Sequence, residues 1–141
     1  MSNSEEFIAQ RRLVHEFRRE EKWKQLRKYF AAARTGNEKI VKKHLEAGVS
    51  VNAVDPTTRF TALHYGAARR AYVMLETLLN QPDIDHIVRD RFGRLPSELA
   101  GRFSEDPELA DRLRTLELWQ AQNQGVKLTY RPRLSPPKAG L

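Results

Sequence analysis

The sequence predicts an all-α protein whose short helices stack as repeats, and three observations support this. A polar turn that begins at Asp55 recurs 35 residues later at Asp90, and a period in this range is typical of stacked helical repeats. Apolar side chains recur at helical spacing along residues 38–48 and 72–79. Small residues stand before both segments, where the helices of neighbouring repeats would approach closely.

The N-terminal residues 4–20 have the pattern of an amphipathic helix. One side of this helix is expected to be apolar and to contain Ile8, Leu13, Val14 and Phe17. We expect residues 1–21 to cap the stack, because a terminal repeat would otherwise expose its apolar edge. The alternative is a segment that binds a partner or a membrane surface, although mixed charges on its polar side argue against an anionic membrane.

Several later helices carry marked ends. Asn37 suits an N-cap and Gly48 suits the position after the C-terminus of the helix between them. Thr61 suits the N-cap of the next helix. Asp106 precedes a proline, which is typical of an N-cap followed by the first helical position. These local signals place helix boundaries without reference to tertiary contacts.

The run AAARTGNEKIVKKHLEAGVSVNAVD, which ends at Asp55, and the segment TALHYGAA, which begins at Thr61, resemble the ankyrin repeat family. The resemblance implies two short antiparallel helices and a projecting β-turn finger in each repeat. It also implies that His64 bonds the turn of its own or the neighbouring repeat and is structural. The resemblance covers about residues 22–120, divided into repeats at about 22–54, 55–89 and 90–120.

The sequence departs from the family pattern at four places, one of which is an extended turn at residues 82–85. The first finger, residues 55–60, is one residue longer than the pattern and lacks its glycine. Residues 95–98 read Leu-Pro-Ser-Glu where the family has Thr-Pro-Leu-His. Arg70 stands where the first repeat has Gly36, so the links between the paired helices are expected to differ.

The net charge of +7 is unevenly distributed over the 141 residues. Residues 121–141 contain four basic residues and no acidic one, and they include three prolines, which predicts a flexible basic tail. A tail that folds back across the stack is the alternative, because Val126, Leu128 and Tyr130 alternate with polar residues. No long apolar run and no signal-like N-terminus occur, so we expect a soluble, intracellular and most simply cytoplasmic protein.

No pattern in the sequence indicates catalysis. The four histidines lack the spacing of a helical metal pair, and there is no cysteine. Phosphate-binding loops and nucleophile motifs are also absent from the sequence. Asp55 and Asp90 recur at equivalent positions, which indicates turn residues instead of catalytic carboxylates. We therefore predict no enzyme activity, cofactor, metal or small-molecule substrate.

The sequence instead favours binding to a protein, because arginines and phenylalanines recur at equivalent repeat positions. In the ankyrin family, partners are usually held by the fingers and by the first helix of each repeat, on the concave side. The candidate partner-binding residues on this basis are Arg34, Arg59, Phe60, Arg69, His86, Arg89, Arg91, Phe92, Arg94 and Arg102. Arginine and aromatic residues suit an acidic protein surface. A nucleic-acid partner is the alternative, because guanidinium groups also bind phosphates and the tail is basic.

Overall fold

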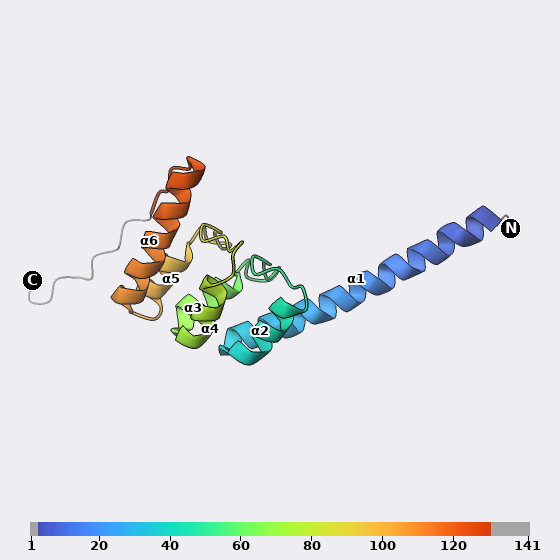
Figure 1. Ribbon diagram of the computed structural model, residues 1–141, viewed down its shortest axis with the longest axis horizontal. Coiled ribbons are helices and arrows are strands. Elements are labelled where there is room, and N and C mark those ends of the chain that lie inside the picture. The colour runs from blue at the N-terminus through green and yellow to red at the C-terminus, as the bar shows by residue number, and fades with distance from the viewer. Residues whose placement is uncertain (1–2, 131–141) are drawn as a thin grey trace, which may run out of the picture.

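The computed structural model describes residues 3–130, and within them the chain forms six α-helices and no strand (Figure 1). The helices are α1 (Asn3–Thr35), α2 (Glu38–Glu46), α3 (Ala62–Arg69), α4 (Tyr72–Leu79), α5 (Pro96–Arg102) and α6 (Pro107–Gln124). The predicted all-α class is therefore confirmed. None of these helices has an apolar stretch long enough to span a membrane.

The helices pack as a row of pairs. The end of α1 packs against α2 and α3, α3 packs against α4 and α5, and α5 packs against α6. One buried apolar cluster lies between α1, α2, α3 and α4 and includes Tyr29, Val41 and Met74. A second cluster, between α3, α4, α5 and α6, includes Leu99. Phe60 is partly buried and packs against both clusters, so it joins the two halves of the core.

The predicted helix ends are confirmed where they depend on a capping side chain. The side chains of Asn37, Thr61 and Asp106 each accept a hydrogen bond from a backbone N–H of the helix that follows. The links after α1 and α3 differ less than the sequence suggested. Gly36 and Arg70 both have left-handed backbone conformations, with φ of 71° and 53°. Arg70 therefore adopts a conformation that glycine takes more easily.

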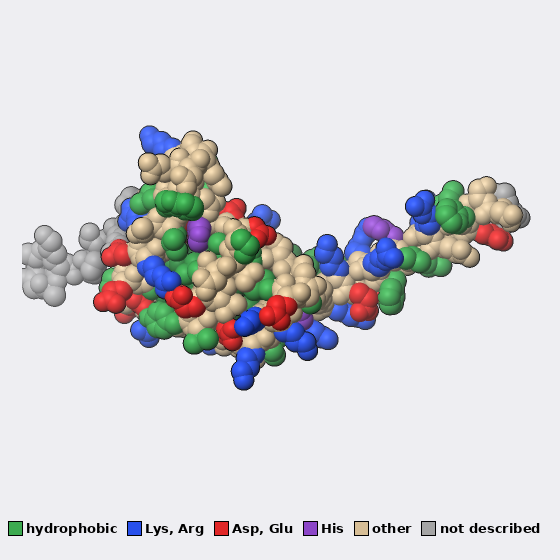
Figure 2. All heavy atoms as spheres, in the orientation of Figure 1, with side chains coloured by type: hydrophobic (Ala, Val, Ile, Leu, Met, Phe, Trp, Pro, Cys, Tyr) green, Lys and Arg blue, Asp and Glu red, His purple; other side chains and the backbone are tan. Residues whose placement is uncertain are grey.

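The largest departure from the sequence analysis is the N-terminal helix. Residues 1–21 were expected to form a separate cap, but α1 is one continuous helix of 33 residues, about 50 Å long. Residues 3–24 are all exposed and project away from the stack, with apolar side chains standing in solvent (Figures 1 and 2). The capping prediction is wrong because residues 20–23 contain no proline or glycine that would end the helix.

The flexible-tail prediction is also wrong for its first ten residues. Helix α6 continues through Gln124, and Gly125 ends it with φ of 68°. The chain then packs against the stack: the Tyr130 hydroxyl donates to Glu117 Oε1 at 2.9 Å, and Arg89 Nη2 donates to a backbone carbonyl at residue 129. The remaining tail residues, 131–141, lie outside the described residues.

Candidate partner-binding surface

Two tight turns precede α3 and α5, and an aspartate holds each of them. We call residues 55–60 turn 1 and residues 90–94 turn 2. In turn 1 the Asp55 carboxylate accepts hydrogen bonds from a turn N–H and, at 2.7 Å, from the Tyr65 hydroxyl. In turn 2 the Asp90 carboxylate accepts from two turn N–H groups and from Arg94 Nε. The interpretation of both aspartates as turn residues is confirmed.

His64 connects the start of α3 to turn 2. Its Nδ1 accepts a hydrogen bond from Thr61 N at 3.1 Å, so the ring proton is on Nε2, which donates to the Arg94 carbonyl at 3.1 Å. The side chain is fully buried, and this burial lowers the pKa of His64. The structural role expected for His64 is therefore confirmed.

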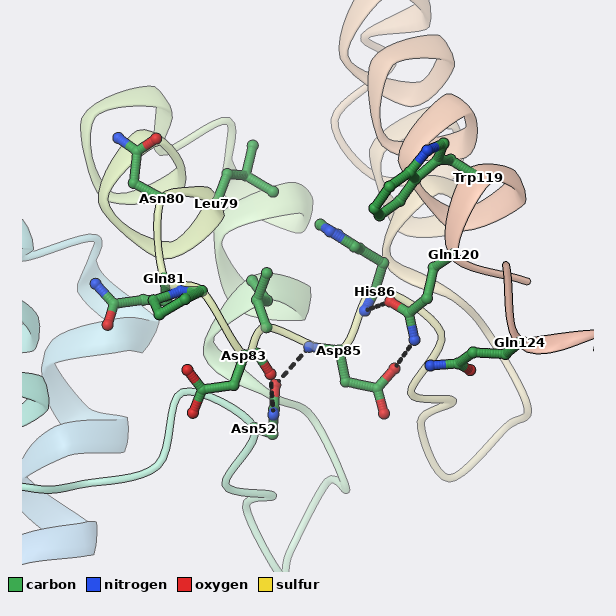
Figure 3. A pocket seen from close by; sticks show the side chains of 12 residues that line it. Asn52, Leu79, Asn80, Gln81, Asp83, Asp85, His86, Trp119, Gln120 and Gln124 are labelled. Atoms are coloured by element: carbon green, nitrogen blue, oxygen red, sulfur yellow. Dashed lines mark hydrogen bonds between the residues drawn. The ribbon is translucent and has the colours of Figure 1, made fainter. Parts of the chain in front are cut away.

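A ladder of side-chain amides links the loop that contains turn 1 to the loop that contains turn 2, and links the latter to α6 (Figure 3). Asn52 Nδ2 donates to the Asp83 carbonyl at 2.8 Å, and Asn52 Oδ1 accepts from Asp85 N at 2.7 Å. Gln120 repeats the arrangement on α6: its Nε2 donates to Asp85 Oδ1 and its Oε1 accepts from His86 N. The sequence analysis gave neither amide this role, because each partner is more than thirty residues away.

The same residues line an open pocket of roughly 680 Å³. His86, predicted to bind a partner, is buried in the wall of this pocket, with its ring directed between Leu79 and Trp119 (Figure 3). Burial lowers the pKa of His86. His86 therefore does not stand on an exposed turn as the sequence suggested.

Two of the predicted arginines belong to the framework. The Arg94 side chain is 12 % exposed and its Nε lies 2.7 Å from Asp90 Oδ2. Arg89 donates through Nη1 to the Gly93 carbonyl at 2.8 Å and through Nη2 to the Thr129 carbonyl at 3.0 Å. Both guanidinium groups hold turn 2, and Phe60 is likewise a packing residue, stacked on His64 with ring centroids 5.3 Å apart.

Three predicted arginines do form an exposed series. Arg34, Arg69 and Arg102 lie in the last turns of α1, α3 and α5, the helices that pack side by side. All three are exposed, and none forms a salt bridge within the described residues. Turns 1 and 2 precede α3 and α5, whereas Arg69 and Arg102 lie in the last turns of these helices, at the opposite edge of the stack. A helix of the length of α3 separates the two edges by about 12 Å.

The remaining predicted residues lie at the exposed tips of the turns. Arg59 is exposed with φ of 60° in turn 1, and turn 2 has a glycine with a similar conformation, Gly93, with φ of 75°. Arg91 is exposed in turn 2, and its guanidinium carbon lies 5.9 Å from the centroid of the Phe92 ring. Phe92 itself is 57 % exposed. These three side chains are placed where a partner could reach them.

A second exposed phenylalanine, Phe103 at the end of α5, was missed by the sequence analysis and shares Arg94 with Phe92. The Arg94 guanidinium carbon lies 4.9 Å from the Phe92 ring centroid and 5.0 Å from that of Phe103. Phe103 is 56 % exposed, next to Arg102. We call Arg34, Arg69, Arg102, Phe92 and Phe103 the first-helix face. The signal in the sequence that could have identified Phe103 was its neighbour, Arg102. The contact between Phe103 and Arg94 could not be predicted, because the two positions do not have the spacing of neighbours on a helix or strand.

Chemically, the first-helix face offers positive charge and exposed aromatic rings, without a reactive centre. Among the described residues no group of three or more histidine and carboxylate side chains lies close enough together to hold a metal ion. No protein-family model matches the chain, and a search of curated proteins also found no match.

Proposed function

We propose that this chain is a non-enzymatic binding module, an ankyrin-type stack that binds an acidic surface of a protein partner. The stack geometry supports the architecture: helices pair antiparallel, aspartate-held turns precede α3 and α5, and His64 connects α3 to the following turn. In the terms of this proposal, turns 1 and 2 are the fingers, and Asn52 and Gln120 join successive repeats. The module would act as an adaptor, inhibitor or targeting subunit.

The observation that carries the binding proposal is the series Arg34, Arg69 and Arg102. Three guanidinium groups at equivalent helix ends, without acidic partners inside the described chain, leave planar donors available for carboxylates. Arginines at helix C-termini also interact favourably with the helix dipole, which accounts for one such residue on each helix. The dipole does not explain the two exposed phenylalanines, Phe92 and Phe103, on the same face.

A protein partner fits this face better than a nucleic acid. The exposed rings are held on either side of Arg94, so their faces are already covered in part by a guanidinium group. Proteins that bind single-stranded nucleic acids stack the bases on aromatic rings whose faces are uncovered. Protein interfaces instead combine aromatic anchors with arginine at the centre of the contact. The arginine and phenylalanine side chains of the first-helix face could therefore contact an acidic protein without rearrangement.

The test compares wild type with an Arg34/Arg69/Arg102→Glu variant. A Lys39/Lys42/Lys43→Glu variant is the matched control, because these three residues are also exposed and their reversal changes the net charge equally. Each protein is used to capture partners from its native lysate with and without nuclease. The captured protein is then titrated directly against all three variants at two salt concentrations.

We expect a nuclease-resistant protein partner whose affinity falls at least tenfold in the arginine variant and much less in the lysine control. Three exposed charge contacts of about 0.5–1 kcal/mol each account for a change of this size. Equal loss in both variants would show that net charge alone governs binding. Capture that disappears with nuclease, with affinity falling steeply as salt increases, would support the nucleic-acid alternative.

A further inference from the structure

The projecting part of α1, residues 3–24, has no neighbour in the stack to cover its apolar side chains. Phe7 is 58 %, Val14 50 % and Phe17 64 % exposed. Together with Gln10 they follow steps of three, four and three residues, which is the spacing of a coiled-coil seam. Isolated helices gain little stability in water without packing of an amphipathic face. This segment therefore has the pattern of a helix that pairs.

The seam and the packed side of α1 point in different directions. At 100° per residue, the seam is rotated by about 100° from the mean direction of Tyr29, Phe30, Ala32 and Ala33, which α1 buries in the stack. A second helix can therefore lie along residues 3–24 without meeting its own stack. Ile8, which the sequence analysis grouped with the apolar side, lies on the opposite side by the same geometry.

Charges on the two flanks of the seam are segregated by sign. Glu6 and Glu20 lie on one flank, at the positions called g in a heptad, and Arg11 and Arg18 lie on the other, at the e positions. In a parallel pair, g of one helix faces e of the other, so Glu6 meets the partner's Arg11. An antiparallel pair would bring glutamates opposite glutamates and arginines opposite arginines. The Glu6–Arg11 pair therefore favours the parallel orientation, while the other g positions, Leu13 and Glu20, meet the partner's Arg18 and Gln25 without a clash of like charges.

We propose that the projecting half of α1 pairs with the same segment of a second copy of this chain as a short parallel coiled coil. The two-fold pair buries Phe7, Val14 and Phe17 against their equivalents and carries one stack on each helix. Glu21 and Lys24 occupy the next seam positions, which ends the apolar contact after two heptads. We expect a weak dimer for this reason, with a dissociation constant on the order of 10–100 µM.

Sedimentation equilibrium of the full chain measures the association. The apparent mass should rise from 16.4 kDa towards twice that value as concentration increases. Val14→Asp should raise the dissociation constant at least tenfold. Ile8→Asp is the matched control, because Ile8 is 53 % exposed on the same helix but lies away from the seam, and it should leave association unchanged. A wild-type chain that stays monomeric at millimolar concentration, or equal effects of both substitutions, would overturn the proposal.

Cross-linking tests the orientation. The chain has no cysteine, so Asn3→Cys introduces a single thiol at the first seam position of α1. A parallel pair brings the two thiols together, whereas an antiparallel pair separates them by roughly 30 Å, too far for a disulfide. We expect oxidation to give a covalent dimer, and we expect Val14→Asp added to the same chain to suppress it. A dimer by mass without cross-linking, or cross-linking that Val14→Asp leaves unchanged, would refute the parallel pairing.

Discussion

Replacement of His64 tests how the stack is held together, because this one side chain bonds both its own helix and the next turn. In His64→Gln, the new side chain can still accept from Thr61 N, as glutamine does at the third position of a capping box. It loses the bond to the Arg94 carbonyl, which is 3.1 Å from His64 Nε2 in wild type. His64→Ala loses both bonds and leaves a cavity, since the wild-type side chain is fully buried.

The two substitutions should therefore differ in free energy of unfolding. A buried carbonyl that loses its donor costs about 1–3 kcal/mol, so we expect that loss for His64→Gln. His64→Ala adds a second unpaired group, the Thr61 N–H, and the missing ring, and we expect a loss of about 3–5 kcal/mol. If His64→Gln loses no stability, the link to turn 2 contributes nothing; if both variants lose the same stability, the bond to Thr61 N and the packing of the ring contribute nothing beyond that link.

The pH dependence gives an independent check. Burial lowers the pKa of His64 in the folded protein, partly offset by the Arg94 carbonyl and by Asp90, so the folded state keeps the ring neutral below pH 6.5 while the unfolded state takes up a proton. Stability from this residue is thus fully present above pH 6.5. It falls by up to about 1.4 kcal/mol per pH unit as the pH decreases towards the lowered folded pKa.

Urea unfolding at pH 7.5 and at pH 5.5 measures both effects. The pKa values of His44 and His86 are also lowered in the folded protein, so all variants should lose stability in acid. This shared part cancels in the difference between wild type and His64→Gln. That difference should shrink by up to about 1.4 kcal/mol between the two pH values. A difference that stays constant would show that His64 takes up its proton at the same pH in the folded and unfolded states, which would refute the lowered pKa.

Three further substitutions have defined outcomes in the same assay. Burial raises the pKa of Glu117, so wild type should lose stability as the pH rises above about 4.5, and Glu117→Gln should remove this decrease. Gly66→Ala should cost about 1–3 kcal/mol instead of stabilising α3, because the added Cβ would lie 2.7 Å from Leu75 Cδ2. Arg70→Gly should raise stability by about 0.5–1 kcal/mol, because its φ of 53° suits glycine better; a lower unfolding midpoint would contradict this.

The parts of the fold that could be predicted from sequence are those whose chemistry is local. The caps at Asn37 and Asp106 depend on residues within one helical turn, so spacing alone identifies them. The length of α1 could not be predicted in the same way. An amphipathic pattern over residues 4–20 fits a cap and a projecting helix equally well, and the choice depends on whether a surface exists for it to cover. The exposed residues 3–24 show that the stack provides none.

The candidate site was less predictable, because exposure of an arginine depends on distant partners. Arg94 has an acid four residues earlier, so its pairing with Asp90 could have been expected from spacing. Arg89 bonds Thr129, forty residues along the chain, and no sequence pattern indicates that contact. Arg102 also has an acid four residues earlier, but the Glu98 carboxylate accepts from Leu95 N and lies 3.9 Å from Arg89 Nη1, so spacing alone did not reveal that Arg102 forms no salt bridge with a described residue.

Arg94 contacts the exposed rings of the first-helix face and also holds turn 2, so it is a poor position at which to test the proposed binding. Its guanidinium positions the Phe92 and Phe103 rings, its Nε bonds buried Asp90, and its carbonyl accepts from His64. Under the proposed binding role, contact with Arg94 would restrict the two rings before a partner arrives, which would reduce the entropy lost on binding. Charge reversal at Arg94 would leave a buried carboxylate without its partner and would disturb turn 2, so lost binding in that variant would not report on the interface. Within residues 3–130, Arg34, Arg69 and Arg102 form no salt bridge with a buried carboxylate, so substitutions there should change the proposed binding without a large loss of stability.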